Sequence, residues 1–115
     1  MPQDLRGGDE LVPLYRAMVR ARAFDAKAIA LQRTGRLGTY ASASGEEAVG
    51  VGASYAMRPE DVLIPGHRNL SAQLLRGVTP LELLLWWGGD ERGNDFAGPR
   101  HDLPGHHDQL VANLF

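Results

Sequence analysis

The sequence predicts a mainly α-helical fold with one short strand. Three segments carry apolar residues at helical spacing, and each is followed directly by a glycine. Two stretches, starting at Ser44 and at Thr79, have the form of a capping box, in which a Ser or Thr is followed three residues later by Glu at the start of a helix. One short apolar run, residues 62–64, ends at a Pro-Gly pair and is of strand type.

Size and composition indicate one soluble globular domain. The chain has 115 residues, 43% of them hydrophobic and 23% charged, which is ordinary for such a domain. A net charge of -2 gives no general attraction to nucleic acid or to an anionic membrane. The absence of cysteine excludes a disulfide framework, a thiolate nucleophile and a cysteine zinc site. No signal-peptide core and no membrane span is expected, and a cytoplasmic location is compatible with this.

The first helix is expected over residues 9–34, after a flexible lead-in at residues 1–8. Asp9 is the expected N-cap, and Gly35 is the expected left-handed residue that ends the helix. The apolar stripe is rich in small residues, so a neighbouring helix can approach closely. Its members are Leu14, Ala17, Met18, Ala21, Phe24, Ala28 and Leu31.

The second helix is expected to start at the capping box formed by Ser44 and Glu47. Gly50 and Gly52 each cost about 1 kcal/mol relative to Ala inside a helix, so both suggest close approach by another backbone. The helix is expected to stop at Arg58, because the residue before a proline is pushed out of the α region.

The strand at residues 62–64 is expected to deliver His67 and Arg68 to its carboxyl end. In open α/β sheets that end is where ligands bind. The guanidinium of Arg68 can form two parallel bonds to a phosphate or carboxylate, or it is solvated or paired with Glu60 or Asp61. His67 either adds a donor or proton shuttle beside it, or is a half-buried strand-end residue.

Two more helices are expected, over residues 69–76 and from the box at Thr79 through Trp87. The buried side of the last helix is expected to hold Leu81, Leu84, Leu85 and one of the two tryptophans, which favours core packing over base stacking. From residue 88 to 107 no helical or strand period remains, so residues 91–115 are expected to form a loop and a divergent tail.

Other candidate residues have competing structural interpretations. Glu46 and Glu47 are a carboxylate pair for acid-base chemistry, but carboxylates in a first helical turn more often serve capping. Three histidines near the end carry metal-ligand atoms, but their spacing matches no known metal motif. They are His101, His106 and His107, with Asp102 and Asp108 nearby. No glycine-rich phosphate loop and no nucleophile elbow is present.

Several short blocks in series resemble one family. They are LYRAMVRARAFD at 14–25, LQRTGRLG at 31–38, SGEEA at 44–48, RPED at 58–61 and RG at 76–77. In this order they resemble the start of the alpha subunit of thiamine-diphosphate-dependent 2-oxo acid dehydrogenases, which include the pyruvate, branched-chain 2-oxo acid and acetoin dehydrogenases. The resemblance covers about residues 9–90 and implies the amino-terminal part of a thiamine-diphosphate-binding α/β fold, incomplete in this chain.

The resemblance implies a heterotetramer with a beta subunit, in which thiamine diphosphate binds between the subunits. A 2-oxo acid is decarboxylated there, and the acyl group passes to a lipoyl-bearing acyltransferase. Arg68 matches the arginine that holds the cofactor diphosphate, and His67 stands where the family usually has a tyrosine. The family's Mg²⁺ motif has no counterpart in this segment.

Without that motif the chain alone is expected to be inactive, as a truncated alpha subunit. The alternative is a catalytically inactive helical interaction module that docks on a beta subunit or on its own copy.

Overall fold

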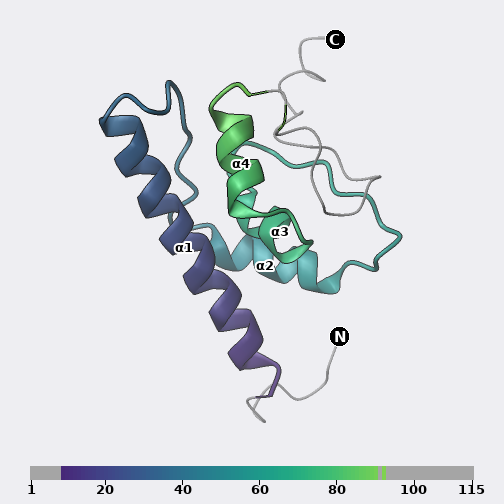
Figure 1. Cartoon of the computed structure of the whole chain (residues 1–115). Helices are drawn as coiled ribbons and strands as arrows, with labels where there is room; N and C mark the ends of the chain where they lie inside the picture. Colours follow the sequence, from purple (N-terminus) through teal and green to yellow (C-terminus); the bar gives the residue numbers. More distant parts are fainter. Residues whose placement is uncertain (1–8, 91, 93–115) are drawn as a thin grey trace.

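Four α-helices make up the part of the chain that the computed structural model describes, residues 9–90 and 92 (Figure 1). In chain order they are α1 (Leu11–Arg33), α2 (Glu47–Ala56), α3 (Leu70–Leu75) and α4 (Pro80–Trp87). The long α1 runs along one side of the molecule, and the three shorter helices lie together beside it. The prediction of a mainly helical fold is confirmed. The expected lead-in at residues 1–8 and nearly all of the expected tail lie outside the described residues.

The first helix is slightly shorter at both ends than residues 9–34. Its N-cap is Glu10 instead of Asp9, and this residue makes no side-chain capping bond. The predicted left-handed glycine after the helix is confirmed, because Gly35 has a φ of 79°, a conformation that favours glycine. None of the helices in residues 9–90 combines the length and the apolar character that crossing a bilayer requires.

The core lies where α1 meets the loop after it and the later helices. Phe24 and Trp87 pack edge-on against Tyr40, with ring centroids 6.3 Å and 5.0 Å from the tyrosine ring. The buried hydrophobic cluster contains Ala21, Phe24, Ala28, Leu37, Tyr40, Ala43, Leu70, Val78 and Leu83. Three of its members, Leu37, Tyr40 and Ala43, come from the loop before α2, so the core holds this loop as well as the helices.

The second helix starts at Glu47, so the predicted capping box at Ser44 is wrong. Its N-cap is Glu46, which makes no side-chain capping bond, and Ser44 is exposed. The Glu47 carboxylate still reaches back, since Oε2 accepts from the Gly45 amide at 2.9 Å, but Oε1 accepts from Arg22 Nε at 2.8 Å. Arg22 on α1 therefore binds the Glu47 carboxylate, which was predicted to cap α2.

Close approach at Gly50 is confirmed. A Cβ on this residue would lie 1.9 Å from Ser71 Oγ and 2.9 Å from the Ala72 amide nitrogen, so only glycine lets α2 and α3 pack at this distance. Ser54, one turn later, donates to the Ala72 carbonyl at 3.3 Å. Gly52 has open space at its Cβ position, so the same prediction is wrong there.

The predicted strand does not form within the described residues. Residues 62–64 are irregular, and Val62 and Ile64 are 51% and 58% exposed. A strand requires a neighbour that pairs with its N–H and C=O groups, and the helical surroundings in residues 9–90 supply none. Apolar character alone therefore gave the wrong assignment.

The last two helices follow the prediction closely. The third occupies Leu70–Leu75, and Gly77 ends it with a φ of 104°. The capping box before the fourth is present, since the Glu82 amide donates to Thr79 Oγ1 at 3.2 Å and the Thr79 amide to Glu82 Oε1 at 2.9 Å.

The side of the fourth helix that faces the core differs from the prediction. Leu83 is 1% exposed, whereas Leu81, which was expected to be buried, is 65% exposed. Leu84 and Trp87 pack against the core, as expected. Six of its eight residues are Leu or Trp and they lie on several sides of the helix, so its apolar period could not indicate the buried side.

Candidate functional site

Arg68 lies on a tight turn that precedes α3. The Asn69 amide donates to the Gly66 carbonyl at 3.3 Å, and the Gly66 amide donates to Asn69 Oδ1 at 2.7 Å. These two bonds close the turn around His67 and Arg68, while the fully buried Pro65 anchors its start. The prediction that a strand end presents Arg68 is wrong, because a turn presents it instead.

The guanidinium of Arg68 contacts the loop before α2. Its Nη1 donates to the carbonyl oxygen of Ser42, and the residue is exposed. Among the described residues no carboxylate pairs with it, so the alternative pairing with Glu60 or Asp61 does not occur there. An arginine carries five N–H donors, and its one bond within residues 9–90 leaves donors for an anion.

The loop that holds Arg68 is itself held by a buried carboxylate on α1. Asp25 is 4% exposed and accepts three hydrogen bonds. Tyr40 Oη donates to Oδ1 at 2.6 Å, Ser42 Oγ donates to Oδ2 at 2.7 Å, and the Ala43 amide donates to Oδ1 at 2.8 Å. Burial, followed by the bond to Asp25, raises the pKa of Tyr40 above its usual range, so its hydroxyl stays protonated as a donor.

Asp25 was not among the candidate residues predicted from the sequence. One signal was available: Asp25 follows Ala21 by four residues and precedes Ala28 by three, so it falls on the apolar stripe of the helix. It is also the single acidic residue of α1, which carries five basic ones. A lone carboxylate on a buried stripe requires hydrogen-bond donors from elsewhere in the chain.

Glu47 forms a second link between the loop region and α1. Its carboxylate is buried beside the largely exposed Arg22, with Nε and Oε1 2.8 Å apart. The hydrogen bond from Arg22 lowers the pKa of Glu47, and the Gly45 amide adds to this effect. For Glu47 these contacts favour a structural role at the start of α2 over acid-base chemistry.

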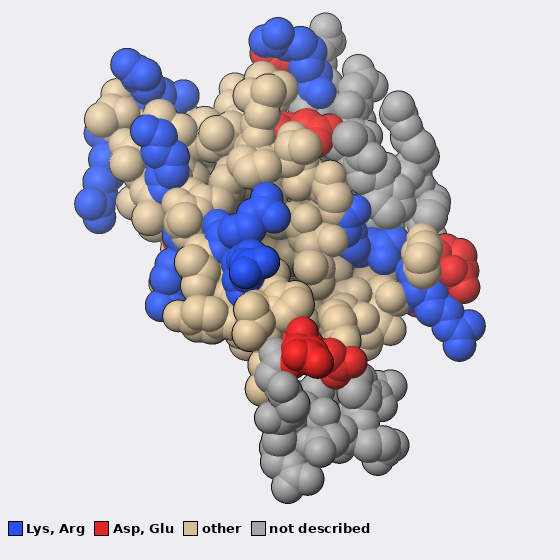
Figure 2. Space-filling model, turned by 60° about the horizontal axis from the view of Figure 1, so that its bottom comes forward, with Lys and Arg blue, Asp and Glu red and all other residues tan. Residues whose placement is uncertain are grey.

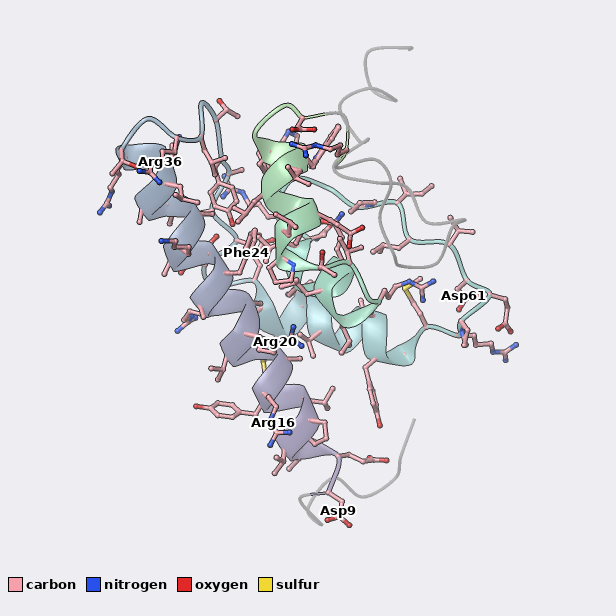
Figure 3. The ribbon with its side chains drawn as sticks, in the orientation of Figure 1. Asp9, Arg16, Arg20, Phe24, Arg36 and Asp61 are labelled. Atoms are coloured by element: carbon pink, nitrogen blue, oxygen red, sulfur yellow. The ribbon has the colours of Figure 1, made fainter. Side chains whose placement is uncertain are left out.

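A groove of about 610 Å³ runs between α1 and the start of α2. Its walls are mostly apolar, and it is lined by Tyr15, Met18, Val19, Arg22, Ala23, Ala26, Gly45, Glu47 and Ala48. Figure 2 shows broad uncharged surface with Lys and Arg spread over it, and in Figure 3 Arg16 and Arg20 project from α1. The helix therefore presents an apolar and cationic surface.

The other predicted candidates contribute less to this site. His67 is half-buried beside Arg68, and Trp87 packs on Tyr40 as a core residue. No group of His, Cys, Asp or Glu within residues 9–90 is arranged to hold a metal ion. His101, His106 and His107 lie outside the described residues.

Comparison with known proteins gives a consistent result. A profile of the family described as "Dehydrogenase E1 component" matches residues 15–112. Pyruvate dehydrogenase E1 component subunit alpha from Staphylococcus aureus is 38% identical over 88 residues, which is 76% of this chain and 24% of that protein. The protein of the same description from Acholeplasma laidlawii is 40% identical over 86 residues, 75% of this chain and 25% of that protein. The chain spans about a quarter of the length of these curated relatives.

Proposed function

The chain belongs to the dehydrogenase E1 component family, and from this premise we propose that it serves as the thiamine-diphosphate-binding part of a 2-oxo acid dehydrogenase alpha subunit. The reaction of that enzyme is oxidative decarboxylation of a 2-oxo acid, with transfer of the acyl group to a lipoyl arm. Thiamine diphosphate supplies the carbanion chemistry when it is bound, and the protein supplies binding and orientation.

The placement of Arg68 is the observation that carries this proposal. The diphosphate is an anion, and an exposed guanidinium on a hydrogen-bonded turn, with N–H donors besides the one that contacts Ser42, suits it chemically. His67, adjacent on the same turn, has imidazole nitrogens that can contribute one more donor. We assign Arg68 the main diphosphate contact and His67 an auxiliary one.

Magnesium does not fit the described residues. A phosphate-bound Mg²⁺ requires carboxylate or carbonyl oxygens arranged around it, and residues 9–90 contain no such acidic group. We therefore assign no Mg²⁺ ligand to this part of the chain. The proposal for Arg68 is independent of the ion.

The groove beside α1 supports a beta subunit as partner. It exposes apolar surface of the kind that marks interfaces, with Tyr15 67% and Val19 47% exposed. The five basic residues of α1 would repel the same helix of a second copy, which favours a partner with acidic groups over self-association. The second candidate function, an interaction module without cofactor binding, uses this same groove.

Titration calorimetry separates the two functions. Thiamine diphosphate with Mg²⁺ is titrated into the purified chain and into Arg68→Ala, with Arg36→Ala as the control for an exposed arginine elsewhere. The proposed function predicts heat that is lost in Arg68→Ala and retained in Arg36→Ala. No heat in any of them, together with self-association in light scattering, would favour the interaction module.

A further inference from the structure

We propose that Asp25 is a positioning residue for Arg68. It acts through one peptide group, between Ser42 and Ala43, that contacts both side chains. The identity of the ligand rests on the function proposed above, but the mechanical link between the two residues does not.

The link begins with the geometry of that peptide group. The Ala43 amide donates to Asp25 Oδ1 at 2.8 Å, and the carbonyl of the same peptide is the acceptor for Arg68 Nη1. A trans peptide is planar, so its N–H and C=O point in opposite directions. Fixing the N–H on the Asp25 carboxylate therefore aims the Ser42 oxygen away from α1 and toward the turn that carries Arg68.

The side chain of Ser42 restricts the same peptide from its other end. Its Oγ donates to Asp25 Oδ2 at 2.7 Å and accepts from the Ser44 amide at 3.2 Å. The two oxygens of one carboxylate thus hold a side chain and the adjoining backbone together. Because Asp25 is 4% exposed, water does not compete freely for these bonds.

Tyr40 provides the contrast that separates positioning from stability. Its hydroxyl also donates to Asp25 Oδ1, at 2.6 Å, but it has no part in the peptide that contacts Arg68. Tyr40→Phe should weaken the fold and leave the Ser42 carbonyl in place. Asp25→Asn keeps the side-chain shape but has one acceptor oxygen for three donors. It should therefore weaken the fold and also release the Ser42 carbonyl from its position.

The test measures the order of the Arg68 side chain without cofactor. The heteronuclear NOE of its Nε–Hε group is recorded by ¹⁵N NMR in the wild-type chain, Asp25→Asn, Tyr40→Phe and the exposed α1 control Lys27→Ala. We expect Asp25→Asn to lower this NOE toward that of a freely moving arginine, while Tyr40→Phe and Lys27→Ala keep it. Ser42→Ala removes both Oγ bonds and keeps the bond from the Ala43 amide to Asp25, so its NOE should lie between those of wild type and Asp25→Asn. It replaces Asp25→Asn if that variant does not fold. An unchanged NOE in the folded variant would overturn the proposal.

A second measurement separates this link from the proposed function. Inorganic pyrophosphate is titrated into the same variants, and we expect affinity to fall about tenfold in Asp25→Asn and to stay within about twofold in Lys27→Ala. If wild-type chain does not bind pyrophosphate while the NOE still falls in Asp25→Asn, the positioning link stands and the cofactor assignment fails. Equal NOE and equal affinity in wild type and Asp25→Asn would contradict the link alone.

Discussion

Gly50 of α2 faces Ser71 of α3 so closely that a Cβ built on the glycine would lie 1.9 Å from the serine Oγ. The Ala72 amide nitrogen would be 2.9 Å away, and as backbone it cannot turn aside. Gly50→Ala should therefore destabilise the fold by about 1–3 kcal/mol in urea unfolding, the usual cost of overpacking. Gly52→Ala is the matched control, because open space surrounds its Cβ position and alanine gains about 1 kcal/mol inside a helix. Equal effects of the two changes would contradict the packing described.

Leu83 should dominate the contribution of α4 to stability. It is 1% exposed within the core, so Leu83→Ala should cost about 2–5 kcal/mol, from lost burial and the cavity left behind. Leu81→Ala changes the same residue type two positions earlier at a site that is 65% exposed, and it should cost well below 1 kcal/mol. Thermal or urea unfolding of both variants measures the difference, and a larger loss at Leu81 would place the wrong side of the helix in the core.

The two Ser/Thr-x-x-Glu segments should behave differently when their first residue is truncated. Thr79→Ala removes a hydroxyl that accepts from the Glu82 amide, so it should cost about 1 kcal/mol. Ser44→Ala should cost little, because Ser44 is exposed and α2 has no side-chain cap. Comparable losses in chemical denaturation would mean that α2 does use the serine as a cap.

Acid should weaken the link between α1 and α2. The folded pKa of Glu47 lies below its ordinary value of 4.5, chiefly because of the hydrogen bond from Arg22. A carboxyl group with a lowered folded pKa stabilises fully above the unfolded pKa, and this contribution is lost as pH falls through the folded pKa. The stability difference between wild type and Glu47→Gln should therefore be constant above about pH 5 and shrink below pH 4.5.

Arg22→Met should remove the same acid-dependent part of the stability by deleting the partner of Glu47. Unfolding free energies measured from pH 3 to pH 7 test both variants. A difference between wild type and Glu47→Gln that does not change with pH would show that the ion pair contributes nothing to folding.

Local signals predicted the structure well wherever one segment determines it. The Thr-Pro-Leu-Glu start of α4 and the left-handed Gly35 and Gly77 depend on neighbours in sequence, and all three are as predicted. The family blocks likewise pointed to the correct family, because several short motifs in a fixed order are specific.

Apart from the close approach at Gly50, features that depend on distant residues were not predicted. Glu47 bonds to Arg22, 25 residues away, which moved the start of α2. The strand at residues 62–64 required a pairing partner that nearby sequence cannot specify. Asp25 meets its donors 15 to 18 residues later in the chain, so a helical period could mark it as buried but could not identify the loop that it holds.

The most direct test of the account is whether the Arg68 side chain itself responds to the diphosphate. The Arg68 Nε–Hε resonance is followed by ¹⁵N NMR while thiamine diphosphate, and separately thiamine, is titrated into the chain. We predict a saturable shift of this resonance with thiamine diphosphate and none with thiamine, because the guanidinium recognises the phosphates. A resonance that stays unmoved by both, or that moves equally with both, would contradict the assignment of Arg68 as the diphosphate-binding residue.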